Sequence, residues 1–232
     1  ASAMIPCEVW PLERVPYAEA LALQERLMAE RAAGAPDRLL LLEHPPVYTL
    51  GSAADAAHIL WGADERARRG VEVAQIDRGG DVTWHGPGQL VAYPILQLPR
   101  MPGAMHANVI GYVRGLERAL INMLATYAVE AYPLKGLTGV WVSTPAGDAK
   151  IAAIGVRVNV KAITKHGIAL NLNADLSYFD GIIPCGIHDK GVTSLAALLG
   201  GPVDEADAYR RFAQAFGAVF ERELVWGAEG KG

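Results

Sequence analysis

Apolar residues recur every three or four positions in three long segments of the chain, which predicts three amphipathic helices. One of them spans 16–33, with Gly34 as its stop, and another spans 203–221, with Asp204 as a candidate N-cap. The pattern is strongest over 107–127, where the apolar stripe consists of Val109, Tyr112, Val113, Leu116, Leu120, Met123, Leu124 and Tyr127. A stripe of this kind is typical of a helix that packs on a core.

The middle of the chain follows a different pattern, of short apolar or alternating runs bounded by turns. These runs predict strands over 38–43, 71–76, 89–98, 139–143, 150–160 and 164–173. Several are separated only by turns, such as 144–147, so antiparallel or mixed pairing is expected rather than an alternating doubly wound sheet. A short helix is expected over 193–199, a weaker helix or loop over 55–69, and irregular structure over 177–191. The predicted fold class is α+β (mixed α/β).

Composition narrows the class of protein. The chain has 232 residues, of which 51% are hydrophobic and 20% charged, so it can bury a sizeable core. Its net charge of −4 argues against a general nucleic-acid binder. We find no run long enough for a membrane span and no secretory signal, and two cysteines are too few for a disulfide framework. We therefore expect a cytoplasmic protein with a single domain over 4–232, the residues 1–3 being a cloning remnant.

The segment 78–88 is unusually rich in glycine and carries polar side chains between the glycines. Glycine permits positive φ angles and a close approach of the backbone to a ligand. A hairpin with a glycine-rich turn explains the composition equally well. The spacing matches neither a Walker A loop nor a dinucleotide fingerprint.

Cys185 lies between Pro184 and Gly186, outside any periodic run. Most free cysteines are inert core residues, which usually sit within a strand or helix stripe. A position on a loop makes a reactive thiol a candidate, although the inert interpretation stays open. Cys7 is a weaker candidate.

Lys150 begins a predicted strand that carries the small residues Ala152, Ala153 and Gly155. Gly167 and Ala169 repeat this feature on a second strand. Two such strands side by side can form a groove for a slender apolar ligand. Ordinary close packing against a helix, and a solvated lysine at a strand end, are the alternatives. The six histidines show no paired ligand spacing, so no metal site and no cofactor are expected.

Several of these segments together resemble lipoyl(octanoyl) transferases. The resemblance rests on 78–80, 83–89, Tyr93, 150–155, 166–171, 184–186 and 192–195, which occur in the family's order. It implies a fold like that of biotin and lipoate protein ligases, with a mixed, largely antiparallel sheet flanked by helices. It also implies an enzyme that moves an octanoyl group from octanoyl-acyl carrier protein to a lysine of lipoyl domains, in 2-oxoacid dehydrogenase E2 subunits and the glycine cleavage H protein.

The resemblance further implies the roles of individual residues. The nucleophile falls on Cys185 and its partner lysine on Lys150. The substrate-binding residues fall on Arg78, Gly79, Gly80, Asp81, Val82, Thr83, Trp84, His85, Ala153, Ile154, Gly155, Gly167, Ile168 and Ala169. His85 is expected to orient the acyl carbonyl or to shape the pocket, and Arg157, Lys161 and Lys165 are candidate contacts for an acidic carrier protein.

Three other functions remain possible from the sequence. An ATP-dependent lipoate or biotin protein ligase would form an adenylate and use no cysteine nucleophile. A papain-like cysteine hydrolase would use His188 or His166 as its base. A non-catalytic acyl-group binder would hold the chain without transferring it.

Overall fold

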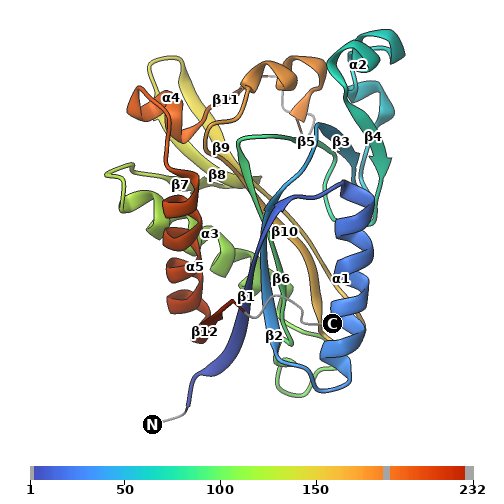
Figure 1. Cartoon of the computed structure of the whole chain (residues 1–232), viewed down its shortest axis with the longest axis vertical. Coiled ribbons are helices and arrows are strands. Elements are labelled where there is room, and N and C mark those ends of the chain that lie inside the picture. Colours follow the sequence, from blue (N-terminus) through green and yellow to red (C-terminus); the bar gives the residue numbers. More distant parts are fainter. Residues whose placement is uncertain (1–2, 185–188, 228–232) are drawn as a thin grey trace.

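The computed structural model describes residues 3–184 and 189–227, and a mixed sheet runs through its centre (Figure 1). Within the described residues the sheet has the strand order β12-β1-β2-β6-β10-β9-β8-β7, and β11 pairs with β9. Its strands are β1 (Ile5–Arg14), β2 (Asp37–Glu43), β6 (Gln89–Ile95), β7 (Tyr132–Leu134), β8 (Leu137–Thr144), β9 (Gly147–Val158), β10 (Thr164–Asn171), β11 (Gly191–Val192) and β12 (Arg222–Trp226). The strands from β2 to β7 pair antiparallel, whereas β1 pairs parallel with β2 and β12. The prediction of a mixed, largely antiparallel sheet is confirmed.

Helices cover both faces of this sheet (Figure 1). Helix α1 (Tyr17–Ala32) packs on β6 and β10, where Leu27, Leu40 and Tyr93 belong to one apolar cluster. The opposite face is covered by α3 (Val109–Ala125) and α5 (Glu205–Phe220), which pack on each other over the larger cluster. All three long helices fall where the apolar periodicity places them. Asp204 caps α5 as expected, since its carboxylate accepts a hydrogen bond from the Asp207 amide.

A second, smaller sheet stands beside the end of the main one. It has the order β4-β3-β5 and consists of β3 (Val47–Leu50), β4 (Glu72–Gln75) and β5 (Val82–His85). The remaining elements lie around it or near the end of α5: η1 (Ala56–His58), α2 (Ala63–Arg69), η2 (Leu176–Gly181) and α4 (Leu195–Leu199). The small sheet holds the glycine-rich 78–81 loop against the main sheet, and this contact creates the site.

Six strands of the described chain were not expected from the sequence, namely β1, β3, β5, β7, β11 and β12. The outermost strand β12 shows why, because its attachment depends on a distant ion pair. Arg222 at its start donates to the buried carboxylate of Asp37 at 2.9 Å, and Arg31 donates to the same carboxylate at 2.7 Å. No local pattern of apolar residues encodes such a contact. In the part of the chain that is described, no helix combines the length and apolar character of a membrane span.

Candidate functional site

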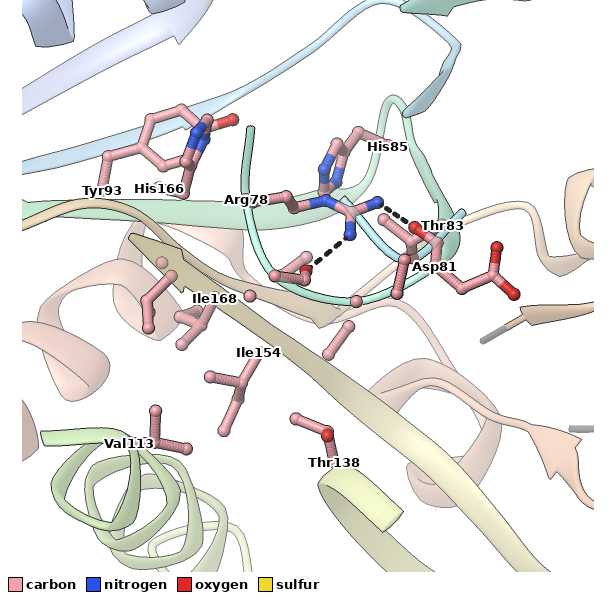
Figure 2. Close-up of a pocket in the computed structure, with 18 of the residues that line it drawn as sticks. Arg78, Asp81, Thr83, His85, Tyr93, Val113, Thr138, Ile154, His166 and Ile168 are labelled. Carbon is pink, nitrogen blue, oxygen red and sulfur yellow. Dashed lines mark hydrogen bonds between the residues drawn. The ribbon is translucent and has the colours of Figure 1, made fainter. Parts of the chain in front are cut away.

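A cavity of about 570 Å³ lies where the 78–85 segment crosses β9 and β10 (Figure 2). The cavity runs along the part of β9 after Ala152. This part of β9 has an open edge, because its pairing with β8 ends at Ala152. One end is polar, with Tyr93, His166 and His85, and the opposite end is mostly apolar, with Val113, Ile154 and Thr138 (Figure 2). The cavity is shaped for a ligand with a slender apolar part.

Twelve of the predicted substrate-binding residues line this cavity: Arg78, Gly79, Gly80, Asp81, Thr83, His85, Ala153, Ile154, Gly155, Gly167, Ile168 and Ala169. The other two, Val82 and Trp84, point to the far side of β5, because successive side chains of a strand face opposite ways. Trp84 is fully buried there and stacks on Tyr178 at a ring distance of 5.0 Å. These two residues support the strand and do not contact the cavity.

Arg78 organises the glycine-rich loop. Its guanidinium donates to the carbonyl oxygens of Thr49 at 2.7 Å, of Asp81 at 2.8 Å and of Gly79 at 2.9 Å. The amide of Gly79 donates to the Val156 carbonyl at 3.3 Å, which attaches the loop to the open edge of β9. Five donors in a rigid fork suit this task, because one side chain satisfies several carbonyls of a turn. Arg78 thereby keeps the roof of the cavity in place.

Lys150 lines a much smaller cavity that adjoins the main one. Thr83, Ala153 and Ala169 belong to the walls of both, and Pro184 closes the smaller one. Lys150 is only 7% exposed, so its ammonium is held inside the protein rather than at a solvated strand end. Cys185, which follows Pro184 directly in sequence, lies outside the described residues, as does His188.

The segment that leads to Cys185 is anchored by backbone hydrogen bonds to the loop around η1. The amide of Ile183 donates to the His58 carbonyl at 2.8 Å, and the amide of Leu60 donates to the Gly181 carbonyl at 2.7 Å. The imidazole of His58 also pairs with the carboxylate of Asp81 in the glycine-rich loop. The two segments that carry most of the predicted chemistry are thus connected through η1, a link that no sequence motif marked.

A chain of hydrogen bonds sets the tautomer of His85. Asn171 Nδ2 donates to the Thr193 carbonyl at 3.1 Å, so its Oδ1 faces Gln89 and accepts from Gln89 Nε2 at 3.0 Å. Gln89 Nε2 donates to the Trp84 carbonyl as well, at 3.1 Å, which leaves Gln89 Oε1 as the acceptor for His85 Nδ1 at 2.8 Å. His85 therefore carries its proton on Nδ1 and has a lone pair on Nε2.

His85 stays neutral because burial lowers its pKa to about 3. A neutral ring whose Nδ1–H is already engaged has no proton left to donate to an acyl carbonyl. That His85 orients the carbonyl stays a prediction, and any such role would use the lone pair of Nε2 or the shape of the ring rather than an N–H donor. His85 shapes the cavity and offers a hydrogen-bond acceptor.

Sequence reasoning missed His44, which is fully buried beneath the polar end of the cavity. Its Nδ1–H donates to the Val15 carbonyl at 2.7 Å, so its Nε2 accepts from the Tyr93 hydroxyl at 2.7 Å. Burial lowers the pKa of His44 to about 4, against the opposing effect of the Val15 carbonyl. In the sequence, the two prolines that follow His44 indicate only that a strand ends there, so nothing pointed to a role in the site.

Asp77 gathers the cations beside the cavity. His166 Nε2 lies 2.8 Å from Asp77 Oδ1, and Lys165 Nζ lies 2.8 Å from Asp77 Oδ2. Burial acts to raise the pKa of Asp77, but hydrogen bonds from Lys165 and His166 outweigh it and hold this pKa at about 2. Arg157 also approaches Asp77, at 3.5 Å. Of the candidate carrier-protein contacts, Lys165 is buried in this ion pair and Lys161 is exposed.

His166 has a φ of +58°, the left-handed conformation that a histidine rarely adopts within a strand. Its amide donates to Gln24 Oε1 at 2.7 Å, and its ring is bound to Asp77. Because its ring is bound to Asp77, His166 has a structural partner and is not a free general base of the kind that a cysteine hydrolase would need. Among the described residues, no three His, Cys, Asp or Glu side chains gather as metal ligands.

Comparison with known proteins places the chain in a family. Its residues 16–217 match the model of the lipoyl protein ligase A/B catalytic domain. Proteins named octanoyltransferase are similar along most of their length: one from Chloroflexus aggregans is 48% identical, covering 94% of this chain and 96% of its own, and one from Solibacter usitatus is 47% identical, covering 96% of each.

Solved structures share the fold at low sequence identity. A bipartite lipoate protein ligase from Thermoplasma acidophilum has a TM-score of 0.76 at 16% identity, covering 98% of this chain and 88% of its own. A lipoate-protein ligase A bound with ATP has a TM-score of 0.74 at 16% identity, over 98% of this chain and 90% of its own. The chain therefore belongs to the lipoyl protein ligase A/B catalytic domain family, with the ligase-like mixed sheet that its sequence motifs imply.

Proposed function

We propose that this protein transfers an octanoyl group from octanoyl-acyl carrier protein to a lysine of lipoyl domains, through a thioester on Cys185. The observation that carries the proposal is the pair of adjoining cavities. The buried Lys150 and Pro184 line the small one, and the large one provides an apolar wall for the acyl chain. Relatives called octanoyltransferase that cover nearly the whole chain support the same activity.

Lys150 is the residue that would make the thiol reactive. A free thiol with a pKa near 8.5 is only about 3% thiolate at pH 7. An ammonium nearby favours the thiolate, and burial strengthens the effect because the local dielectric constant is low. Lys150 is buried and lines the same small cavity as Pro184, the residue directly before Cys185 in sequence. Its positive charge therefore lies near the end of the segment 181–184.

The proposed reaction has two steps. The Cys185 thiolate attacks the carbonyl carbon of the octanoyl thioester, the bond to the carrier's sulfur breaks, and the leaving thiolate takes a proton from the Lys150 ammonium. The amine of the incoming lysine then attacks the acyl-enzyme, its proton passes to Lys150, and the amide forms as the Cys185 thiolate is released. The thioester supplies the activation, so no ATP is consumed.

The apolar part of the cavity would bind the chain. Ile154, Val113 and Leu137 offer aliphatic contacts, and Gly155 and Gly167 add no side chain to the lining. Seven methylene and methyl groups at roughly 0.8 kcal/mol each give a burial free energy of about 5 kcal/mol. This is sufficient for a preference among chain lengths.

Intact mass spectrometry tests the proposal. The protein is incubated with octanoyl-acyl carrier protein without ATP, and we expect one octanoyl adduct, absent in Cys185→Ser. Cys7→Ser is the matched control, because Cys7 is fully buried and burial raises the pKa of its thiol to about 12. Addition of a lipoyl domain should move the adduct to that domain.

Activity from free octanoate only with ATP would instead identify a ligase, and cleavage of peptides would identify a hydrolase. Retention of octanoyl without transfer, unaffected by Cys185→Ser, would identify a binder.

A further inference from the structure

Trp141 of β8 and Lys150 of β9 are direct cross-strand partners. The Nζ of Lys150 lies over the indole ring of Trp141, 5.1 Å from the ring centre. Trp141 is only 1% exposed and Lys150 only 7%, so the ammonium and the ring meet away from bulk water. The strands β7, β8, β9 and β11 lie side by side around this pair (Figure 1).

The Trp141 side chain is not part of the main apolar core. Val140 and Val142, its neighbours along β8, belong to the core cluster under α3 and α5, whereas Trp141 points to the other face of the sheet. Its Nε1 is buried and has no hydrogen-bond partner among the described residues. A buried, unpaired N–H is unfavourable, so a smaller apolar side chain would serve better if packing were the only requirement.

The electrostatics of the ring explain the choice. The face of an indole carries partial negative charge and attracts an ammonium but not a neutral amine. The attraction is larger where both groups are withdrawn from water. The Trp141 ring thus attracts the Lys150 side chain and fixes where its Nζ lies, at the wall of the small cavity.

We propose that Trp141 is a positioning residue for the reaction: its ring holds the Lys150 side chain in place at the small cavity, and from that position the ammonium favours the thiolate of Cys185. This inference rests on the proposed function. No sequence motif of the substrate-binding segments includes Trp141.

Other charged groups face the pair and enter any pH profile. Asp148 lies two residues from Lys150 on the same face of β9, and it accepts a hydrogen bond from the Tyr132 hydroxyl of β7. Lys190, which precedes β11, lies 3.9 Å from the same carboxylate. Asp148 is thus engaged by Tyr132 and Lys190.

The test is the rate at which iodoacetamide alkylates Cys185, followed by peptide mass spectrometry from pH 5.5 to pH 10, in wild type, Trp141→Leu and Trp141→Phe. In Trp141→Leu we expect the rate at pH 7 to fall about three- to tenfold and to converge on the wild-type rate near pH 9.5, where the thiol ionises unaided. Trp141→Phe retains a ring and should fall between the two. Trp10→Leu is the matched control, since Trp10 is a buried indole with Arg38 at 5.3 Å, far along the sheet, and it should not change the profile.

A double-mutant cycle separates this role from a structural one. In a Lys150→Met background, Trp141→Leu should have no further effect on alkylation at pH 7. An equal loss in that background, or wild-type rates in both Trp141 variants, would overturn the inference. If Lys150→Met itself alkylates at the wild-type rate, the proposed Cys185–Lys150 pair is wrong, and that result differs from a failure of Trp141 alone.

Discussion

Gly155 of β9 lies directly opposite Gly167 of β10, and the two glycines form part of the floor of the main cavity. They are not equivalent. A Cβ on Gly167 would lie 2.0 Å from the Ala92 carbonyl oxygen, which belongs to a paired strand, whereas a Cβ on Gly155 would lie 3.0 Å from Arg78 Cδ in the loop above. A side chain at position 167 would therefore clash with the neighbouring strand of the sheet, whereas a side chain at position 155 would press on the Arg78 side chain in the loop.

We expect Gly167→Ala to lower the free energy of unfolding by about 1–3 kcal/mol, as overpacking of a core does. Gly155→Ala should stay close to wild type in stability but displace the Arg78–Gly79 loop, raising the KM for octanoyl-acyl carrier protein several-fold. Urea unfolding and steady-state kinetics measure the two effects. Equal stability of both variants would show that the Ala92 carbonyl can move aside.

Replacing Lys150 by Met keeps most of the side chain and removes the charge. We expect acyl-enzyme formation at pH 7 to slow at least about tenfold, since each tenfold change in the thiolate ratio corresponds to about 1.4 kcal/mol. The deficit should shrink above pH 9. Arg118→Met, which removes an exposed positive charge on α3, is the control and should acylate normally. Equal rates for the two variants at pH 7 would leave Lys150 without a role in the chemistry.

The hydrogen-bond chain through Gln89 predicts that His85 is the Nδ1–H tautomer. Long-range ¹H–¹⁵N NMR should show an unprotonated Nε2 in wild type, and the ring should remain neutral down to about pH 4, because burial lowers the pKa of His85 to about 3. In Gln89→Met the ring should populate both tautomers. An Nε2–H resonance in the wild-type protein would contradict this assignment.

Stability should depend on pH through the same buried histidines. Burial lowers the pKa of His44 to about 4 and that of His85 to about 3, whereas an unfolded histidine has a pKa near 6.5. Between these values the unfolded chain binds more protons, so stability falls as the pH drops from about 6.5 to 4, by up to about 1.4 kcal/mol per pH unit for each histidine.

Thermal unfolding from pH 7 to pH 4 measures this loss. His44→Gln keeps a donor and an acceptor for Val15 and Tyr93 but does not titrate, so its stability should decline less steeply than that of wild type. Parallel pH profiles for the two proteins would show that His44 does not contribute to acid sensitivity.

Local patterns were sufficient for much of the fold. The stripes at 16–33, 107–127 and 203–221 became α1, α3 and α5, because each buries one face on a core and the helical period records that burial. The short apolar or alternating runs became β2, β4, β6, β8, β9 and β10. Strand β5 was hidden because its four residues follow the glycines of the 78–81 loop and are buried on both faces, so they show no alternation.

Patterns along the chain were enough to predict the long helices and the central strands, and the order of the family motifs singles out Cys185, Lys150 and most of the cavity lining. These features are local, or occur in a characteristic order along the chain. The three-dimensional arrangement was needed to show that Lys150 is buried against Trp141 and that His85 is an acceptor. It was also needed to show that η1 connects Asp81 to the segment before Cys185. Each of these depends on a hydrogen bond or a ring contact between segments far apart in sequence, and a linear pattern does not record which distant partner a polar group meets.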